Sequence, residues 1–214
     1  MSMRVLVVLG GDQLVADRMS PWVDSATHVI AVDGGFHHLE SVGRLPQWVA
    51  GDFDSADLGA VPDSVIRVHF PDQDQTDFEK VLRWCFEQGF DSVHVACSEG
   101  DLPDHQLQNF YTAAAALVDV WFVFRRGMGR IVRSENGEFK VPTPVGARAS
   151  LIPLTACDSV TLQGVQWPLD RATLVPLGLS SISNRAVDSV ISVGLERGQA
   201  LIFWETNEVI WEES

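Results

Sequence analysis

Cysteine is scarce in this chain of 214 residues, and its three cysteines lie far apart without a C-x-x-C pair. Cys85, Cys97 and Cys157 therefore predict neither a disulfide framework nor a zinc knuckle, and they favour a reducing, cytoplasmic location. Adjacent histidines occur only at His37 and His38, and the chain contains no H-x-x-x-H or H-E-x-x-H spacing. A zinc site is therefore not expected.

Positive charge is also in short supply. The chain has 15 Lys and Arg residues against 29 Asp and Glu residues, which gives a formal net charge of -14. We therefore expect no nucleic-acid and no membrane partner, because nonspecific binding to either polyanion needs a positive surface. The apolar run in the N-terminal "MSMRVLVVLGG" is far shorter than the roughly 20 residues of a membrane span and lacks a small-residue cleavage site.

The usual phosphate-binding glycine motifs are missing as well. The chain contains no G-x-x-x-x-G-K-[S/T] and no G-x-G-x-x-G, and "RRGMGR" (125–130) lacks the lysine of a Walker motif. A bound nucleotide would then be held by glycine turns and by magnesium on carboxylates.

The first part of the chain alternates short apolar runs with segments of helical period, which predicts an α/β region with a mostly parallel sheet. The runs lie at 4–9, 28–32, 47–50, 65–70, 92–97 and 120–124. The clearest helix is "TDFEKVLRWCFEQG", and a second is "DHQLQNFYTAAAALV". Their apolar stripes contain Phe78, Val81, Leu82, Cys85 and Phe86 in the first helix, and Leu107, Phe110, Tyr111, Ala114, Leu117 and Val118 in the second.

After Arg125 the pattern changes to short extended runs separated by Gly, Pro and Asn. Asn136-Gly137 in "RIVRSENGEFKV" predicts a hairpin turn. We therefore expect two closely packed domains, an α/β domain at 1–131 and an all-β domain at 132–214.

Three short sequences with Gly and Asp directly follow apolar runs: "GGD" (10–12), "DGG" (33–35) and "GDFDS" (51–55). Ligands of open α/β sheets bind at the carboxyl ends of the strands, so these turns are candidate phosphate and magnesium sites. In an extended segment, Asp52 and Asp54 point the same way and can share a cation. Each sequence is also ordinary turn chemistry, and that alternative stays open for any one of them.

More aspartates precede the two predicted helices. Thr76 and Glu79 fit a capping box, in which Asp77 would simply favour the helix dipole. That account leaves Asp72 and Asp74 unexplained. Asp104 is open to both readings, as a site residue or as the N-cap of its helix.

Seven segments together resemble the thiamine pyrophosphokinase (thiamin diphosphokinase) family. In chain order they are "DGGFHHL", "GDFDS", "DQTDFEK", "DHQLQN", "SLIPL", "GVQWPL" and "SISN". The resemblance runs from about residue 31 to the C-terminus. It implies an α/β domain, a C-terminal β-sandwich and a homodimer with active sites at the subunit interface. It also implies the Mg²⁺-dependent transfer of a pyrophosphoryl group from ATP to the hydroxyl of thiamine, giving thiamine diphosphate and AMP.

The resemblance also implies a role for individual residues. In the first domain, Asp52, Asp54 and Asp77 would bind Mg²⁺, and catalysis would use these three with Asp104. The nucleotide would contact Asp33, Gly34, Gly35, Thr76, Lys80 and Asn109. In the second domain, Trp167 would offer an aromatic face to thiamine, and Ser183 with Asn184 would supply polar contacts.

One segment departs from the family pattern. Members usually read G-G-R-x-D-H, whereas this chain reads "GDLPDH", with Asp101 for the second glycine and Leu102 for the arginine. Arg125, Arg126 and Arg130 are candidates to replace that cation. The change leaves room for two alternatives: a pyrophosphokinase for another hydroxymethyl heterocycle such as a pterin, and a non-catalytic thiamine or nucleotide binding protein.

Overall fold

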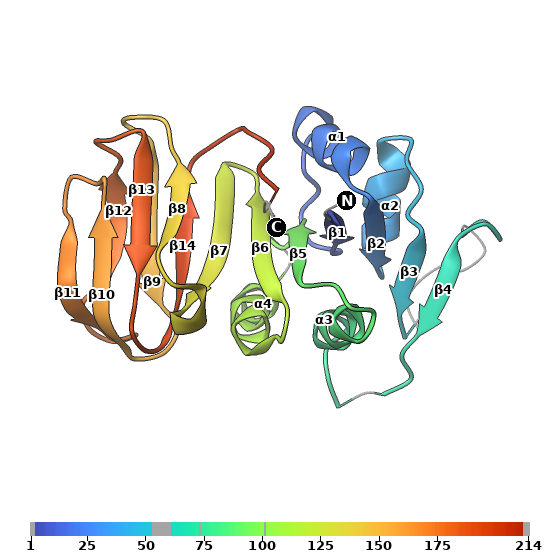
Figure 1. Cartoon of the computed structure of the whole chain (residues 1–214). Coiled ribbons are helices and arrows are strands. Elements are labelled where there is room, and N and C mark those ends of the chain that lie inside the picture. Colours follow the sequence, from blue (N-terminus) through green and yellow to red (C-terminus); the bar gives the residue numbers. More distant parts are fainter. Residues whose placement is uncertain (1–2, 53–60, 73, 101, 212–214) are drawn as a thin grey trace. The chain divides into compact units, whose positions relative to one another are not determined.

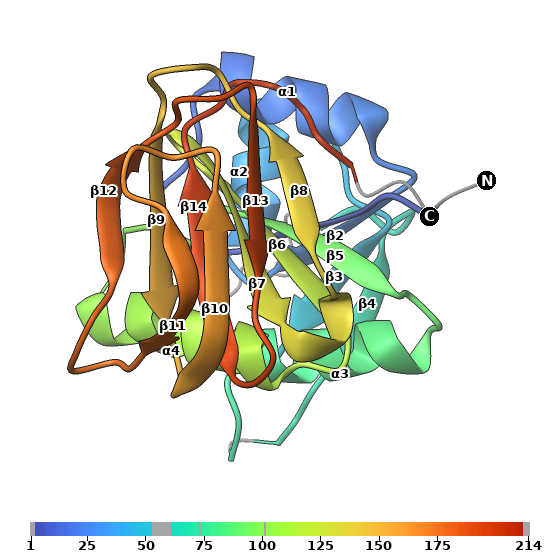
Figure 2. The same cartoon turned by 60° about the vertical axis from the view of Figure 1, so that its left-hand side comes forward.

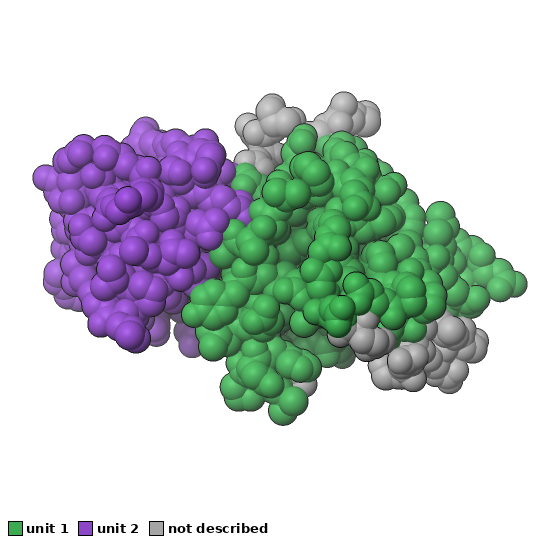
Figure 3. All heavy atoms as spheres, turned by 90° about the horizontal axis from the view of Figure 1, so that it is seen from below, with its two compact units in different colours: residues 1–125, 208–214 green, residues 126–207 purple. Residues whose placement is uncertain are grey.

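The computed structural model describes residues 3–52, 61–72, 74–100 and 102–211, and the chain forms two compact units (Figure 3). Unit 1 contains Met1–Arg125 with Glu208–Ser214, and unit 2 contains Arg126–Asn207. The boundary predicted after residue 131 falls inside strand β7, Gly127–Arg133. Because β7 pairs along its whole length with β14, Gln199–Trp204, it belongs with unit 2.

Unit 1 is built on six parallel strands in the order β6-β5-β1-β2-β3-β4 (Figure 1). The strands are β1 Val5–Val8, β2 His28–Val32, β3 Trp48–Gly51, β4 Ile66–His69, β5 Ser92–Ala96 and β6 Asp119–Phe124. All six lie in the apolar runs that predicted strands. The central strands β1, β2 and β5 are buried almost throughout, as expected for strands covered on both faces.

Helices cover both faces of this sheet, with α1 and α2 on one face and α3 and α4 on the other (Figures 1 and 2). They are α1 Ala16–Ser25, α2 Gly35–Ser41, α3 Asp77–Glu87 and α4 Pro103–Ala115. No helix in the described ranges is both long enough and apolar enough to cross a membrane.

The apolar stripes predicted for α3 and α4 are only partly confirmed. In α3 the stripe is buried up to Cys85, but Phe86 is 49% exposed. In α4, Leu107 and Tyr111 are exposed, whereas Ala114 is buried and the ring of the half-buried Phe110 lies 5.3 Å from that of Phe122. The helical period predicts which residues share one side of a helix, but it does not predict how wide the buried part of that side is.

The end of the chain returns to unit 1 and not, as predicted, to the second domain. The ring of Trp211 lies 5.0 Å from Trp22 and 4.5 Å from His94. Its Nε1 donates to Ser25 Oγ at 3.0 Å, and His94 Nε2 contacts the Ile210 carbonyl oxygen at 3.0 Å. This segment therefore completes an aromatic cluster of unit 1.

Unit 2 consists of two sets of antiparallel strands, ordered β12-β9-β14-β7 and β11-β10-β13-β8 (Figure 2). The strands not yet given are β8 Phe139–Pro142, β9 Arg148–Pro153, β10 Cys157–Gln163, β11 Leu169–Leu174, β12 Ser181–Arg185 and β13 Val190–Gly194. Side chains of the two sets pack together, since the ring centroid of Phe139 in β8 lies 6.2 Å from that of Trp204 in β14. The described residues of unit 2 contain strands and a short 3-10 helix but no α-helix.

The hairpin predicted at Asn136-Gly137 is wrong. The segment turns, as Gly137 has φ +64° and donates its N–H to the Ser134 carbonyl oxygen at 3.2 Å. The turn is part of a short 3-10 helix, Ser134–Asn136, which carries the chain from one set of strands to the other. Strand β7 therefore pairs with β14, and β8 pairs with β13.

Candidate functional site

A cavity of about 450 Å³ lies in unit 1 at the carboxyl ends of strands β1, β2 and β5. Strands β1 and β5 are neighbours, and the chain leaves them toward opposite faces of the sheet, so the cavity sits at the topological switch point. Its lining residues come from the ends of these strands and the turns after them, from the start of α3 and from the first two turns of α4. They are Leu9, Gly10, Gly11, Val32, Asp33, Gly34, Thr76, Asp77, Phe78, Cys97, Ser98, Gly100, His105, Gln108 and Asn109.

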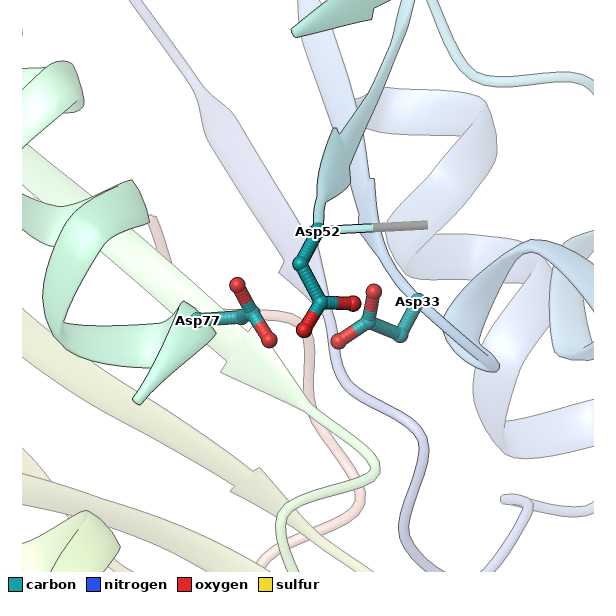
Figure 4. Close-up of side chains that lie close together, drawn as sticks. All are labelled: Asp33, Asp52 and Asp77. Carbon is teal, nitrogen blue, oxygen red and sulfur yellow. The ribbon is translucent and has the colours of Figure 1, made fainter. Parts of the chain in front are cut away.

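Three carboxylates converge at this cavity. Asp33 follows β2, Asp52 follows β3 and Asp77 begins α3. One carboxylate oxygen from each lies within 4.8 Å of the others, and Figure 4 shows the three groups pointing toward one another. The sequence predicted Asp52 and Asp77 as metal ligands but assigned Asp33 to the nucleotide. The fold brings Asp33 into the carboxylate cluster because parallel strands end at one edge of the sheet.

Asp33 has the most perturbed electrostatics of the three. Burial, the charge of Asp77, a side-chain hydrogen bond with Asp77 and the charge of Asp52 raise the pKa of Asp33 to about 7, while Lys80 opposes the shift. Its Oδ1 is buried and accepts no hydrogen bond from any described residue. Its backbone also has φ +45°, an uncommon conformation for a residue other than glycine. A buried oxygen without a donor, beside two further carboxylates, fits a hard divalent cation such as Mg²⁺.

Lys80 supplies the positive charge beside the cluster. Its side chain is only 6% exposed, and its Nζ lies 3.1 Å from Asp77 Oδ1. The ammonium also donates to the Phe70 carbonyl oxygen at 3.5 Å. Lys80 therefore fixes the Asp77 carboxylate and offsets part of the negative charge that faces the cavity.

The segment "DQTDFEK" contains both a helix cap and a member of the carboxylate cluster. Thr76 and Glu79 form the predicted capping box: the Glu79 N–H donates to Thr76 Oγ1 at 3.3 Å, and the Thr76 N–H donates to Glu79 Oε2 at 2.8 Å. Asp77, however, also joins the carboxylate cluster. Of the remaining aspartates, Asp72 accepts the Asp74 N–H at 2.9 Å, which is a local turn contact and not a site contact.

Glycines let the chain approach itself closely at this edge. Gly34 lines the cavity. Gly35 is buried beneath it, where a Cβ would lie 2.0 Å from the Val8 carbonyl oxygen. The role of Gly35 is therefore to let α2 begin directly against β1, and it is not among the residues that line the cavity.

The other predicted residues of unit 1 divide into three groups. Asn109 lines the cavity with Thr76. Asp104 is exposed in the first turn of α4, behind an N-cap at Leu102, and it is neither a lining residue nor a member of the described cluster. Asp54 lies outside the described residues, as does Asp101.

Sequence reasoning missed three polar residues that line the cavity: Ser98, His105 and Gln108. His105 and Gln108 are followed by Asn109 at helical spacing, so the polar side of "DHQLQN" was the signal that could have found the last two. Gln108 Nε2 also donates to Glu79 Oε1 at 3.5 Å, which links α4 to α3 beside the cavity.

Arg125 is the candidate cation that belongs to unit 1. Its Nη1 lies 3.0 Å from Asp12 Oδ2, and its Nε lies 3.6 Å from Glu99 Oε2. These two carboxylates follow β1 and β5 and are sequence neighbours of lining residues. Arg126 instead pairs with Glu205 at 3.2 Å, and the guanidinium of Arg130 lies over the Phe139 ring at 4.6 Å, both within unit 2.

The predicted thiamine-binding residues lie close together in unit 2, at strand β12 and the loop before β11. Trp167 is 58% exposed, and Ser183 is exposed with φ +60°. Asn184 is only 1% exposed and forms hydrogen bonds with both backbone polar groups of Trp167.

Comparison with known proteins gives matches in both units. Residues 20–119 match the family described as Thiamin pyrophosphokinase, catalytic domain, and residues 138–199 match Thiamin pyrophosphokinase, vitamin B1 binding domain. The protein Thiamin pyrophosphokinase 1 of Caenorhabditis elegans is 32% identical over 220 residues, which cover 93% of this chain and 87% of that protein.

Solved structures give the same result for the fold. Thiamine pyrophosphokinase from Bacillus subtilis superposes with a TM-score of 0.79 at 24% identity, covering 95% of this chain and 99% of that one. Thiamin pyrophosphokinase from Candida albicans gives a TM-score of 0.77 at 16% identity, covering 95% of this chain and 89% of that one.

Proposed function

We propose that this chain, which belongs to the thiamin pyrophosphokinase family, transfers the pyrophosphoryl group of ATP to thiamine at the carboxylate cluster of unit 1. The oxygen of the thiamine hydroxyl forms a bond to the β-phosphorus of ATP, and the bond from that phosphorus to the α-phosphate oxygen breaks. The hydroxyl proton is released, and the products are AMP and thiamine diphosphate. The observation that carries the proposal is the cluster of Asp33, Asp52 and Asp77 at the edge of the cavity.

Mg²⁺ is the cofactor that we propose for this cluster, with Asp33, Asp52 and Asp77 as its protein ligands and Asp54 as a further candidate. When bound, the ion neutralises the charge of the phosphates to be transferred. The residues themselves bind and orient, which is most of what this class of reaction requires. Lys80 holds Asp77 in place, and the capping box fixes the turn that carries both residues.

For the nucleotide, we propose contacts from Gly34, Thr76 and Asn109, which line the cavity. Gly10 and Gly11 line the same cavity, and turns without side chains let a phosphate approach the backbone. Asp104 is a weaker candidate for orienting the thiamine hydroxyl than the sequence suggested, because it does not line the cavity, whereas its neighbour His105 does. Asp54 stays a candidate for that role.

We assign thiamine binding to unit 2, which we interpret as a β-sandwich because side chains of its two sets of strands meet. Trp167 would stack on the thiamine rings, and the exposed Ser183 would contact their polar groups. The homodimer and the cytoplasmic location expected from the sequence stay predictions. Light scattering on the purified protein tests the first of these.

Incubation with ATP, Mg²⁺ and thiamine tests the reaction directly. We expect AMP and thiamine diphosphate in equal amounts, and no product after Mg²⁺ is removed by chelation. Asp52→Asn and Asp54→Asn should abolish turnover and leave the circular dichroism spectrum unchanged. Wild-type rates in both variants would remove the metal hypothesis.

The same assay separates the two alternatives left by "GDLPDH". AMP formed only with another acceptor, such as a hydroxymethyl pterin, would assign the chain to a related pyrophosphokinase. Thiamine binding without AMP formation would indicate a non-catalytic binding protein. The convergence of three carboxylates argues against a non-catalytic binding protein, because the carboxylates repel one another unless a cation binds between them.

A further inference from the structure

The side chain of Asn184 is buried against the backbone of Trp167. The Asn184 Nδ2 donates to the Trp167 carbonyl oxygen at 2.7 Å, and the Trp167 N–H donates to Asn184 Oδ1 at 3.1 Å. Only 1% of Asn184 is exposed, against 58% of Trp167. The Asn184 amide therefore forms hydrogen bonds with both backbone polar groups of Trp167, while more than half of Trp167 is exposed to solvent.

The remaining hydrogen-bonding capacity of Asn184 is also used. A primary amide has two N–H donors and an oxygen with two lone pairs. Nδ2 donates a second hydrogen bond to Ser181 Oγ at 3.0 Å, and Oδ1 accepts a second from the Arg185 N–H at 2.9 Å. All four positions are filled within unit 2, so a substrate atom would have to displace one of these partners.

A backbone irregularity turns Asn184 inward. The register of β12 against β9 shifts between Ser181 and Asn184, as in a β-bulge, and Ser183 within it has φ +60°. The Ser183 N–H donates to the buried hydroxyl of Ser150 at 3.0 Å. This irregularity places Asn184 beneath the strand while Ser183 stays exposed.

The two residues before Trp167 are also fixed to the end of β12 and the residue after it. The Gln166 N–H donates to the Arg185 carbonyl oxygen at 2.8 Å, and Val165 forms a bridge with Ala186. Without the Asn184 amide, the Trp167 N–H and carbonyl would lose the partners that set the direction of the indole.

We infer that Asn184 is a positioning residue, which presents the Trp167 indole to thiamine and does not itself contact the substrate. The inference rests on the proposed function, in which Trp167 stacks on thiamine, and it replaces the substrate contact that the sequence suggested for Asn184. Asparagine suits this role because aspartate lacks the donor that the Trp167 carbonyl needs.

A double-mutant cycle tests whether Asn184 acts through Trp167. Asn184→Ala and Trp167→Ala should each raise KM for thiamine roughly tenfold, the usual loss for one aromatic stacking contact with a heterocycle. The double variant should have the KM of Trp167→Ala alone, and KM for ATP should change less than about twofold throughout. A further rise in the double variant would indicate direct contact and overturn the inference, as would an unchanged KM in Asn184→Ala.

Two controls separate positioning from loss of stability. Gln166→Ala removes an exposed side chain from the same loop. Thr143→Ala removes a buried hydroxyl of unit 2 that donates to the Val141 carbonyl oxygen at 3.2 Å, and it should lower Tm. Neither should change KM for thiamine. An equal rise in Thr143→Ala, at a similar loss in Tm, would show that the role of Asn184 is merely structural.

Hydrogen exchange at the Trp167 amide tests, without any substrate, whether Asn184 fixes the Trp167 backbone. Asn184→Ala should speed this exchange at least tenfold, and Gln166→Ala should leave it unchanged. If Asn184→Ala does not fold, Asn184→Asp keeps the shape and the acceptor for the Trp167 N–H and replaces the two donors by a second carboxylate oxygen. If wild-type protein makes no thiamine diphosphate, the proposed function fails, and unchanged exchange in the Asn184 variants would separately overturn the inference.

Discussion

The Oδ1 atom of Asp33 lies in the space where a side chain at position 51 would begin. A Cβ built on Gly51 would be 1.9 Å from that oxygen, far inside van der Waals contact. Gly51 ends β3 and Asp33 follows β2, and these strands are paired neighbours. The absence of a side chain at residue 51 is therefore what lets the Asp33 carboxylate reach Asp52 and Asp77.

Gly51→Ala should accordingly displace the Asp33 carboxylate from the cluster. We expect Mg²⁺ affinity and turnover to fall at least about tenfold, because the methyl group and Oδ1 cannot share one space. Isothermal titration with Mg²⁺ and a steady-state assay measure the two effects. Gly43→Ala is the control, since Gly43 has φ +69° but nothing within 4 Å of its Cβ position. Equal losses in both variants would show that backbone strain, and not the carboxylate, is responsible.

Replacement of Lys80 should change both stability and the electrostatics of the cluster. Lys80→Met keeps the length of the buried side chain but leaves Asp77 without its ion-pair partner, and breaking a buried pair costs about 3 to 5 kcal/mol. Because Lys80 lowers the pKa of Asp33, its loss should also move the pH midpoint of Mg²⁺ binding upward. Chemical denaturation and Mg²⁺ titration across pH measure these changes. Arg83→Met, an exposed cation of the same helix, should produce neither effect.

Much of unit 1 could be predicted because its sequence signals are local. Six apolar runs gave six strands, and T-x-x-E gave the capping box that starts α3. The placing of Asp52 and Asp77 at one edge followed from a general property of parallel sheets. The sequence also placed the "DGG" turn at this edge but did not assign Asp33 to the metal set, since its close approach to Asp52 and Asp77 depends on the pairing of β2 with β3 and on the lack of a Cβ at Gly51.

The failed hairpin prediction and the unexpected burial of Asn184 both involve partners that are distant in the chain. Asn136-Gly137 has the composition of a hairpin turn, but the strands on its two sides find other partners, β14 and β13. For Asn184, the family resemblance implied a substrate contact, whereas its side chain is only 1% exposed. Its burial results from a β-bulge and a loop many residues earlier in the chain, neither of which a short motif encodes.

Trp211 should contribute to the stability of unit 1 and not of unit 2. Trp211→Ala removes a ring packed on Trp22 and His94 and a hydrogen bond to Ser25, so we expect a loss of about 3 kcal/mol. Hydrogen exchange should show faster opening of β5 and unchanged protection in β10. Leu177→Ala is the control, because that side chain is fully exposed. Faster exchange in β10 alone would contradict the assignment of this segment to unit 1.

The raised pKa of Asp33 predicts how pH affects the metal-free protein. An unfolded aspartate loses its proton near pH 4, whereas in the folded protein Asp33 keeps its proton up to about pH 7. Between these values the folded state binds more protons than the unfolded state. The stability contributed by Asp33 is therefore greatest at low pH, falls as pH rises through this window, and is constant above it.

Mg²⁺ should restore the stability that is lost as pH rises, because it binds the Asp33 carboxylate in place of the proton. Its affinity should rise as pH increases to about 7 and then level off, and binding near pH 6 should release protons. Calorimetry in two buffers of different ionisation enthalpy counts the protons released, and Tm with and without Mg²⁺ gives the stability. Asp33→Asn should remove this part of the pH dependence, raise Tm of the metal-free protein at pH 8 and abolish turnover. Asp63→Asn, which changes an exposed carboxylate, should behave as wild type. If Asp33→Asn keeps the full pH dependence of the wild type, another group of the cluster carries the proton.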